Sequence, residues 1–328
     1  MAIAIKTEQL SRKFGKVTAV DKLDLAIEEG EIFGLLGPNG AGKTTTISML
    51  TGTLHPTSGK AFVHGYDVIK EIDKVRHVIG LVFQEPSVDD LLTGRENLEM
   101  HALLYGIPAK EREPAIKKML ALVELDKRAD DLVRTYSGGM RRRLEIARGI
   151  MHRPKVLFLD EPTLGLDPQS RSHIWEHIAQ LRKETKVTIV LTTHYMDEAD
   201  SLCDRIMIID KGKKIALGTP EELKRSIGED LVFIEQKNPN IAALKKLPFV
   251  QRVQKKDNGV VIAVKESARN LKRLLDAAGK IESVEVHRVS LNDVFLHYAG
   301  RQIHEQDEEG EGEGGFWERS MQSESKRD

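Results

Sequence analysis

The chain has 328 residues, of which 40% are hydrophobic, and its 50 basic and 51 acidic residues give a formal net charge of -1. This length predicts about two domains, and this share of apolar residues is enough for a sizeable core. Because a protein that coats DNA or RNA usually carries a basic excess, the charge balance argues against nucleic acid as the main partner. The single cysteine, Cys203, excludes an internal disulfide.

The apolar segments are short. The opening residues "MAIAIKTEQLSRKF" contain no run long enough for a signal peptide. The runs "KVLFLD" and "VTIVLTT" fall far short of the ~20 residues that span a bilayer. We therefore expect a soluble, cytoplasmic chain that reaches a membrane only through a partner.

Residues 1–226 alternate short apolar runs with helical patterns, which predicts an α/β domain with a mostly parallel sheet. Residues 2–14 and 22–30 alternate in polarity like strands with one wet face. Runs of Ile, Leu, Val and Phe predict buried strands at Gly30–Gly37, Lys155–Asp160 and Val187–Thr193.

Between about residues 86 and 136 the pattern becomes helical and charged. The segments "TGRENLEMHALLYG" and "EREPAIKKMLALVEL" predict two helices, and Thr93 with Glu96 has the spacing of a capping box at the start of the first. We expect a helical insertion between two parts of the α/β core.

Residues 227–300 are expected to form a small α+β domain. Its strands are predicted at 230–236, 250–256, 259–264 and 281–289, and its helices at 240–247 and 268–279. This order resembles a split βαβ sandwich, with a turn at "KDNG". Ser290 is the predicted N-cap of a last helix, "SLNDVFLHYAG". Residues 301–328 are rich in Glu and Gly, which predicts a disordered tail.

The last helix and its domain have two interpretations. The apolar side chains Val294, Phe295 and Tyr298 are expected to anchor a contact with a second copy or with another subunit. Alternatively, they pack on the domain's own sheet, and the domain only braces the larger one.

The segment "GPNGAGKTT" fits the pattern G-x-x-x-x-G-K-[ST] between a predicted strand and a predicted helix. Its glycines let backbone N–H groups wrap phosphates, and the helix N-terminus adds about half a positive charge. Lys43 is expected to reach the β- and γ-phosphates of ATP, and the Thr44 hydroxyl to hold Mg²⁺. The predicted phosphate-binding residues are Gly37, Pro38, Asn39, Gly40, Ala41, Gly42, Lys43, Thr44 and Thr45.

Polar residues follow three other predicted strands. Asp160 and Glu161 end "KVLFLDEP", where one carboxylate can hold Mg²⁺ and the other can polarise the attacking water. Gln84, in "GLVFQEP", is expected to contact Mg²⁺ or water, and His194 to contact the γ-phosphate. Because ligands bind at the carboxyl ends of the strands in open α/β sheets, we expect these residues to lie with Lys43 at one sheet edge.

The stretch "RTYSGGMRRRLEIARG", residues 134–149, predicts a second anion site. Ser137 has the chemistry of an N-cap, and Gly138 with Gly139 leaves the helix start open to close approach. One ATP does not need two such sites from one chain. We therefore expect a symmetric dimer in which each copy offers this segment to the nucleotide of the other.

The arginines of that helix could form a nucleic-acid patch or a solvated face. Arg141, Arg142 and Arg148 all lie three or four residues from Glu145, a spacing typical of modest surface ion pairs. This spacing and the balanced charge favour the solvated face. The buried stripe is predicted at Leu144, Ala147 and Met151.

Together these segments resemble the ATP-binding cassette (ABC) transporter ATPases over about residues 1–225. The P-loop, the Gln84 segment, "YSGGM", "LFLDEP", "LGLDP" and His194 occur in that family's order and spacing. "LTGRENL", "TTHYMDEAD", "GTPEELK" and "SLNDVFLHYAGR" resemble its daunorubicin-resistance, drug-export subfamily, up to about Arg301. The signature segment has Tyr136 and Met140 where the family usually has Leu and Gln.

The resemblance implies further roles. Phe14 stands where the family has an aromatic ring that stacks on adenine, and Val20 is assigned to the same nucleotide-binding set. Glu161 matches the general base and Asp160 the Mg²⁺ ligand, with Thr44 and Gln84 completing the metal set. Asp167 matches the loop that touches the opposing subunit, and it joins Ser137, Gly138 and Gly139 in the set expected at the shared nucleotide.

The resemblance also implies partners. Two copies form a head-to-tail ATP-sandwich dimer, and the helical insertion docks on a separate membrane permease at the inner face of the cell membrane. ATP hydrolysis would then drive export of drugs or other hydrophobic molecules. Export of sodium, lipid or polysaccharide is an alternative. A soluble cassette ATPase acting on ribosomes or DNA is a further one, although one P-loop and no sustained heptads argue against it.

Overall fold

The computed structural model describes residues 2–236, 239–256 and 259–298. The chain forms two compact units, Met1–Pro220 and Glu221–Asp328. This division falls at the start of helix α8 (Pro220–Ile227), whereas the sequence predicts a boundary after residue 226. Helix α8 belongs with the second unit because the Ser226 hydroxyl lies 3.1 Å from the hydroxyl of Tyr298.

The first unit contains a four-stranded sheet in the order β2-β1-β4-β5, in which every neighbouring pair is antiparallel. Its strands are β1 (Ile3–Phe14), β2 (Val17–Glu28), β4 (Ser58–Val63) and β5 (Tyr66–Asp67). The alternating segments of the sequence are strands, as predicted.

A six-stranded sheet in the order β10-β9-β3-β8-β7-β6 forms the centre of the same unit. It is parallel except for β10, which pairs antiparallel with β9. Its strands are β3 (Ile32–Leu36), β6 (Ile79–Val82), β7 (Val156–Asp160), β8 (Thr188–Thr193), β9 (Arg205–Asp210) and β10 (Lys213–Gly218). Every residue of β3, β7 and β8 is buried, as expected for parallel strands covered on both faces.

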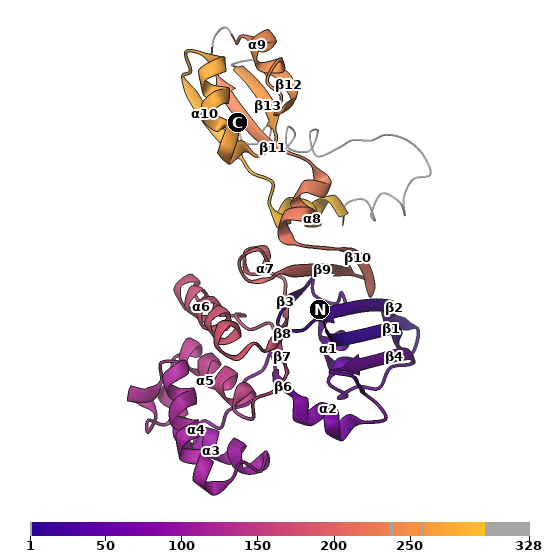
Figure 1. The fold of residues 1–328 in the computed structure, drawn as a ribbon, viewed down its shortest axis with the longest axis vertical. Helices are drawn as coiled ribbons and strands as arrows, with labels where there is room; N and C mark the ends of the chain where they lie inside the picture. The colour runs from indigo at the N-terminus through magenta and orange to yellow at the C-terminus, as the bar shows by residue number, and fades with distance from the viewer. Residues whose placement is uncertain (1, 237–238, 257–258, 299–328) are drawn as a thin grey trace. The chain divides into compact units, whose positions relative to one another are not determined.

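Helices cover this sheet from both sides. In Figure 1 the sheet stands between α1 with the antiparallel sheet on one side and α5 with α6 on the other. The helices are α1 (Lys43–Leu50), α2 (Ile72–Val78), α3 (Gly94–Leu104), α4 (Ala109–Leu122), α5 (Gly138–Ile150), α6 (Pro168–Thr185) and α7 (Met196–Leu202). Two short 3-10 helices lie at Asp126–Arg128 and Val133–Thr135.

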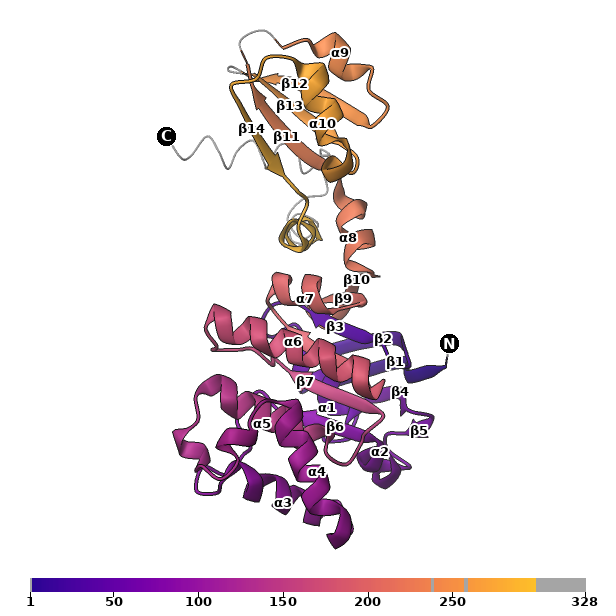
Figure 2. The ribbon, with the colours of Figure 1, turned by 60° about the vertical axis from the view of Figure 1, so that its left-hand side comes forward.

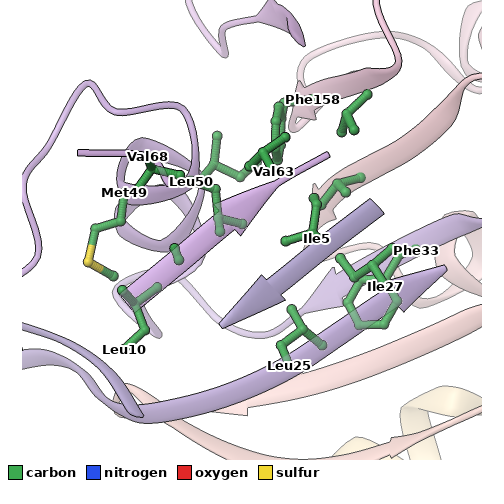
Figure 3. Packing of buried hydrophobic residues seen from close by; sticks show 14 of the residues in the cluster. Ile5, Leu10, Leu25, Ile27, Phe33, Met49, Leu50, Val63, Val68 and Phe158 are labelled. Carbon is green, nitrogen blue, oxygen red and sulfur yellow. The ribbon is translucent and has the colours of Figure 1, made fainter. Parts of the chain in front are cut away.

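The core lies between the two sheets and α1. Figure 3 shows Phe33 and Phe158 of the parallel sheet near Ile5 of β1, and all three are completely buried. Met49 and Leu50 of α1 close the same cluster. Because burying one such side chain contributes about 1.5–3 kcal/mol, this cluster fixes the strand that leads into α1 and so the position of the P-loop.

The segment predicted as a helical insertion, about residues 86–136, contains α3 and α4, which gather with α5 beside β6, the edge strand of the parallel sheet (Figure 2). Thr93 and Glu96 form the predicted capping box. Tyr136, which the sequence left without a role, is buried here, and its hydroxyl donates to the carbonyl of Arg128 at 2.6 Å. A Cβ at Gly94 would lie 2.4 Å from that hydroxyl, so glycine makes room for it.

The second unit has the predicted βαββαβ order and the sheet order β12-β13-β11-β14, with all pairs antiparallel. Its elements are β11 (Asp230–Glu235), α9 (Ile241–Lys245), β12 (Val250–Lys256), β13 (Gly259–Val264), α10 (Ser267–Ala278) and β14 (Ser283–His287). This is a split βαβ sandwich. The predicted turn residues 257–258 and the tail 301–328 lie outside the described residues.

The last helix runs over residues 291–298. Ser290 is its N-cap, because its hydroxyl oxygen accepts the N–H of Asp293 at 3.3 Å. Val294 is completely buried and Phe295 half-buried. The fully buried Val294 and the Tyr298 contact with α8 favour the interpretation in which this helix packs within its own domain.

Candidate active site

The P-loop joins β3 to α1 through a turn that only glycine tolerates. Gly40 and Gly42 have φ of 80° and 104°, and a Cβ at Gly42 would lie 2.4 Å from the carbonyl oxygen of Ala19. Gly42 is also the N-cap of α1, so no side chain caps the first N–H groups of this helix. An uncapped helix start at the end of a glycine-rich turn fits a phosphate group.

Lys43 is the first residue of α1, and its buried side chain reaches back to the start of the loop. Its Nζ donates to the carbonyls of Gly37 at 2.8 Å and Pro38 at 3.1 Å, and it lies 3.4 Å from Oε1 of Glu161. The ammonium group therefore bridges the loop and the carboxyl end of β7.

Side-chain and backbone hydrogen bonds join the carboxyl end of β7 to the neighbouring strand β8. Thr192 of β8 donates its hydroxyl to the carboxylate of Asp160, and the Thr44 hydroxyl lies 3.3 Å from the same oxygen. The backbone N–H of Glu161 donates to Thr192, at 3.0 Å to the hydroxyl and 3.2 Å to the carbonyl. Thr192 thus orients both acids, although no sequence motif marks it.

Glu161 has φ of 47°, in the left-handed region that costs a non-glycine residue about 1–3 kcal/mol. This turn directs the buried carboxylate toward the side chains of Lys43 and His194. Its Oε1 lies 3.4 Å from the ammonium of Lys43 and 3.3 Å from Nδ1 of His194, which is half-buried. The His194 contact lacks the alignment of a hydrogen bond. Five residues predicted from sequence meet here: Lys43, Thr44, Asp160, Glu161 and His194.

Three other predicted site residues lie outside this group. Gln84 is in an exposed segment just after β6, the outermost strand of the parallel sheet. Phe14 ends β1 with 48% of its surface exposed, and the guanidinium of Arg12 lies 4.5 Å from its ring centre. Val20 is completely buried. It packs beneath the P-loop, where a Cβ at Gly42 would lie 3.4 Å from it.

Two helix starts form an exposed surface in the same unit. Ser137 caps α5 by accepting the N–H of Met140 at 3.3 Å. Asp167 caps α6 by accepting from the N–H and the hydroxyl of Ser170, and these bonds hold the pKa of Asp167 below its usual range. A Cβ at Gly139 would lie 3.3 Å from the Ser170 hydroxyl, so the two starts are adjacent. Ser137, Gly138 and Asp167 are exposed.

Arg142 and Glu145 correct the sequence interpretation of α5. Both are buried, with 7% and 3% of their surface exposed, so the assignment of these two residues to a solvated face is wrong. Arg141 does pair at the surface, with Asp90. The predicted stripe is confirmed by the burial of Leu144, Ala147 and Met151.

Glu198 of α7 is a further buried acid, outside the sequence motifs. Its carboxylate accepts from the hydroxyl of Thr163 at 2.8 Å and from Nε1 of Trp175 at 3.0 Å, and burial raises its pKa. It therefore holds α6, α7 and the turn after Glu161 together. No sequence pattern marks this acid as buried.

The comparisons with known proteins match both units. Residues 20–164 match the model of the ABC transporter family, and residues 218–299 match that of the ATP-binding protein DrrA1-3-like C-terminal domain. The linearmycin resistance ATP-binding protein LnrL of Bacillus subtilis is 38% identical over 309 residues, which cover 91% of this chain and 99% of LnrL. The chain belongs to the ABC transporter family. It is an ATP-binding subunit of the drug-resistance and export type, and an ATPase.

Further relatives agree with this membership. The daunorubicin/doxorubicin resistance ATP-binding protein DrrA of Streptomyces peucetius is 41% identical over 307 residues, covering 90% of this ABC subunit and 92% of DrrA. A Nod factor export ATP-binding protein I of Burkholderia thailandensis is 39% identical over 306 residues, covering 92% of this chain and 99% of that protein.

Solved structures show the same cassette fold. CbiO1 of Clostridium perfringens, part of the ABC transporter complex cbiONQ, superposes with a TM-score of 0.64 at 29% identity, covering 69% of this chain and 95% of cbiO1. The cassette MJ0796, solved as a dimer with ADP and Pi, gives a TM-score of 0.59 at 27% identity, covering 66% of this chain and 98% of MJ0796. Within the described residues, no helix is long and apolar enough to cross a bilayer.

Proposed function

We propose that this ATPase drives export of a drug or other hydrophobic molecule through a separate permease, with two ATP sites shared between two copies of the chain. One observation carries the catalytic part. The buried Glu161 carboxylate lies at the end of β7, within 3.4 Å of Lys43 and 3.3 Å of His194, beside a P-loop.

In this proposal Glu161 is the general base. Its carboxylate accepts the proton of the attacking water, and Lys43 stabilises the charge on the β- and γ-phosphates. His194 contacts the γ-phosphate and keeps the carboxylate aligned. Phe14 offers an exposed ring on which adenine stacks, and Val20 supports the loop from below.

The residues at the end of β7 also fit Mg²⁺. The Thr44 hydroxyl and the Asp160 carboxylate are hard oxygen donors 3.3 Å apart, the kind of ligand that Mg²⁺ prefers. Gln84 adds an amide oxygen from the neighbouring loop. When bound, Mg²⁺ offsets negative charge on the phosphate oxygens.

The second copy supplies the rest of each site. Ser137, Gly138 and Asp167 are exposed at two adjacent helix starts, and MJ0796 was solved as a dimer. An exposed serine-capped helix start suits the phosphates of a nucleotide held by another copy. Gly139 allows the close approach of α6, and in the dimer Asp167 touches the opposing subunit.

The permease is proposed to dock beside the helical insertion. A hollow of about 390 Å³ lies between β6, α3 and α5, and its lining includes Leu81, Phe83, Leu104, Tyr105 and His152. Leu104 has 76% and Phe83 46% of its surface exposed, so both offer apolar surface at this hollow. A short amphipathic helix of the permease would cover them. With the permease docked there, the subunit would lie at the inner face of the cell membrane.

The cargo is proposed from the relatives' names, which include linearmycin resistance and daunorubicin resistance. Nod factor export proteins at 38–39% identity favour a second candidate, a cargo similar to a Nod factor. The test is expression of this chain together with a candidate permease from the same genome in a drug-sensitive bacterium, with growth measured against a panel of drugs. We expect resistance to at least one compound with the native chain and none with Glu161→Gln. Equal resistance with both chains would overturn the proposal.

A further inference from the structure

A single buried guanidinium joins α5 to the ends of two strands. Nε of Arg142 donates to the carbonyl of Pro162 at 2.8 Å, and Nη2 donates to the carbonyls of Asp160 at 2.9 Å and Glu161 at 3.2 Å. Nη1 donates to the carbonyl of Phe83 at 2.6 Å. Arg142 therefore holds the backbone that carries the base and the backbone that precedes Gln84.

Glu145, one turn further along α5, completes this connection. Its Oε2 accepts from Nη1 of Arg142 at 2.9 Å, and its Oε1 accepts the backbone N–H of Ser87 at 2.7 Å. The loop that contains Gln84 is thus held on both sides, at the carbonyl of Phe83 and at the N–H of Ser87. No other residue type offers five N–H donors in one rigid plane, so only arginine can contact all of these carbonyls at once.

Stability alone gives a weak reason for this arrangement. A buried ion pair loses its hydration, and apolar residues of similar volume are often as stable in its place. What apolar residues cannot supply is a fixed position for three backbone segments. The same helix begins at Ser137, in the exposed segment proposed to meet the other copy's nucleotide.

We propose that Arg142 and Glu145 are positioning residues that join this chain's Glu161 and Gln84 loop to α5, so that the two ATP sites of a dimer are mechanically coupled. This inference rests on the proposed roles of Glu161 and Ser137. When the start of α5 settles on the partner's nucleotide, the guanidinium transmits that position to the turn that directs Glu161. Release of the γ-phosphate at one site then alters the position of Glu161 at the other site. The change passes through about one turn of α5.

The test measures ATPase kinetics of the full chain carrying Arg142→Met with Glu145→Met, which removes both charges together. We expect kcat to fall at least tenfold, while KM and the affinity for trinitrophenyl-ATP stay within twofold of the native values. Arg142→Lys keeps the charge beside Glu145 but lacks the planar fork, so it should show a similar fall in kcat. The urea midpoint of each variant reports whether the fold is retained.

Arg143→Met is the matched control. Arg143 lies on the same helix, but its guanidinium donates to the carbonyl of Val123 at 2.8 Å and pairs with Glu124 at 3.5 Å, within the helical insertion. Its kcat should stay within twofold of the native value.

A double variant that folds and keeps the native kcat would overturn the inference, as would a fall in kcat matched by an equal loss of nucleotide affinity. If the double variant does not fold, native kcat in Arg142→Lys overturns it. Glu161→Gln, measured in parallel, separates a failure of the proposed catalytic base from a failure of the proposed coupling. Turnover in that variant contradicts the proposed base, whereas an inactive Glu161→Gln with a fully active double variant contradicts only the coupling.

Discussion

At the scale of single residues, the proposed hydrolysis depends on the conformation of Glu161. Its left-handed backbone follows a strand whose last residues are all buried, and bonds from its N–H to Thr192 hold it there. The turn aligns the carboxylate with Lys43 and His194 and not with the core. Replacing one oxygen of this carboxylate by an amide nitrogen should therefore slow ATP hydrolysis and leave ATP binding intact.

We predict that Glu161→Gln abolishes steady-state ATP hydrolysis while ATP still binds and dimers accumulate. The amide has the same shape but accepts no proton from water, so the loss should be at least about a hundredfold, the lower end of what a general base contributes. Phosphate release measures the turnover and light scattering measures the dimer. Native turnover in this variant would exclude Glu161 as the base.

His101 supplies a prediction about pH. It lies in α3, with its ring centre 4.5 Å from that of Tyr105 and 5.7 Å from that of His152, and with Arg148 nearby. Burial, and after it the neighbouring His152 imidazole and Arg148 guanidinium, lowers the pKa of His101 from 6.5 to about 4. Between these two values the unfolded chain binds a proton that the folded chain does not, so stability is lost as pH falls through this window.

Acidification from pH 7 to pH 5 should therefore destabilise the first unit. After a discount for the partial exposure of His101, its share is roughly 1 kcal/mol. His101→Phe keeps an aromatic ring beside Tyr105 and removes the titrating group. Urea unfolding followed by circular dichroism at both pH values should show a smaller pH effect in the variant. An identical pH effect in both proteins would contradict this assignment.

At the scale of elements, the start of α5 combines a cap with an exposed surface. The Ser137 hydroxyl accepts the N–H of Met140, and the residues beside it leave no side chain over the helix end. The P-loop lies on a different element of the same unit. A bulky cation at Ser137 should consequently disturb the contact between copies and not the binding of ATP to one copy.

We predict that Ser137→Arg leaves ATP binding to the monomer unchanged and blocks ATP-dependent dimers of the Glu161→Gln background. Loss of the cap costs about 1 kcal/mol, too little to unfold the unit. Size-exclusion chromatography with light scattering measures the dimer. Ser170→Ala, which alters the neighbouring helix start without adding bulk, is the control and should still dimerise. Dimers in Ser137→Arg would contradict the shared site.

Many elements could be predicted from the sequence because their signals are local. Strands buried on both faces read as continuous apolar runs, and the Thr93 capping box needs only a spacing of three residues. The burial of Arg142 and Glu145 could not be predicted in this way. An ion pair at i,i+3 has the same spacing on a wet face as in a core, and the carbonyls that bind Arg142 come from segments far away in the chain.

At the scale of the molecule, the candidate site is assembled from β3, β7 and β8, which are adjacent in the parallel sheet although β3 is far from the other two in the chain. The order of strands thus brings the P-loop, the Asp160–Glu161 pair and His194 to one sheet edge. The order of the motifs in the sequence predicts that these residues lie close together only when the sheet is assumed to be parallel. The roles of Phe14, Gln84 and Asp167 stay predictions, because they depend on a nucleotide and on a second copy.

The contact with the permease can be tested by two leucines in different units. Leu104 has 76% of its surface exposed and lines the hollow beside the helical insertion, whereas Leu296 has 62% exposed on the last helix of the second unit. Leu104→Asp should abolish copurification with the permease and drug resistance, because it places a charge against an apolar partner helix. It should leave the ATP affinity of the isolated subunit within twofold of the native value. Leu296→Asp should copurify normally. The opposite pattern, with the permease lost only from Leu296→Asp, would place the docking surface on the second unit instead.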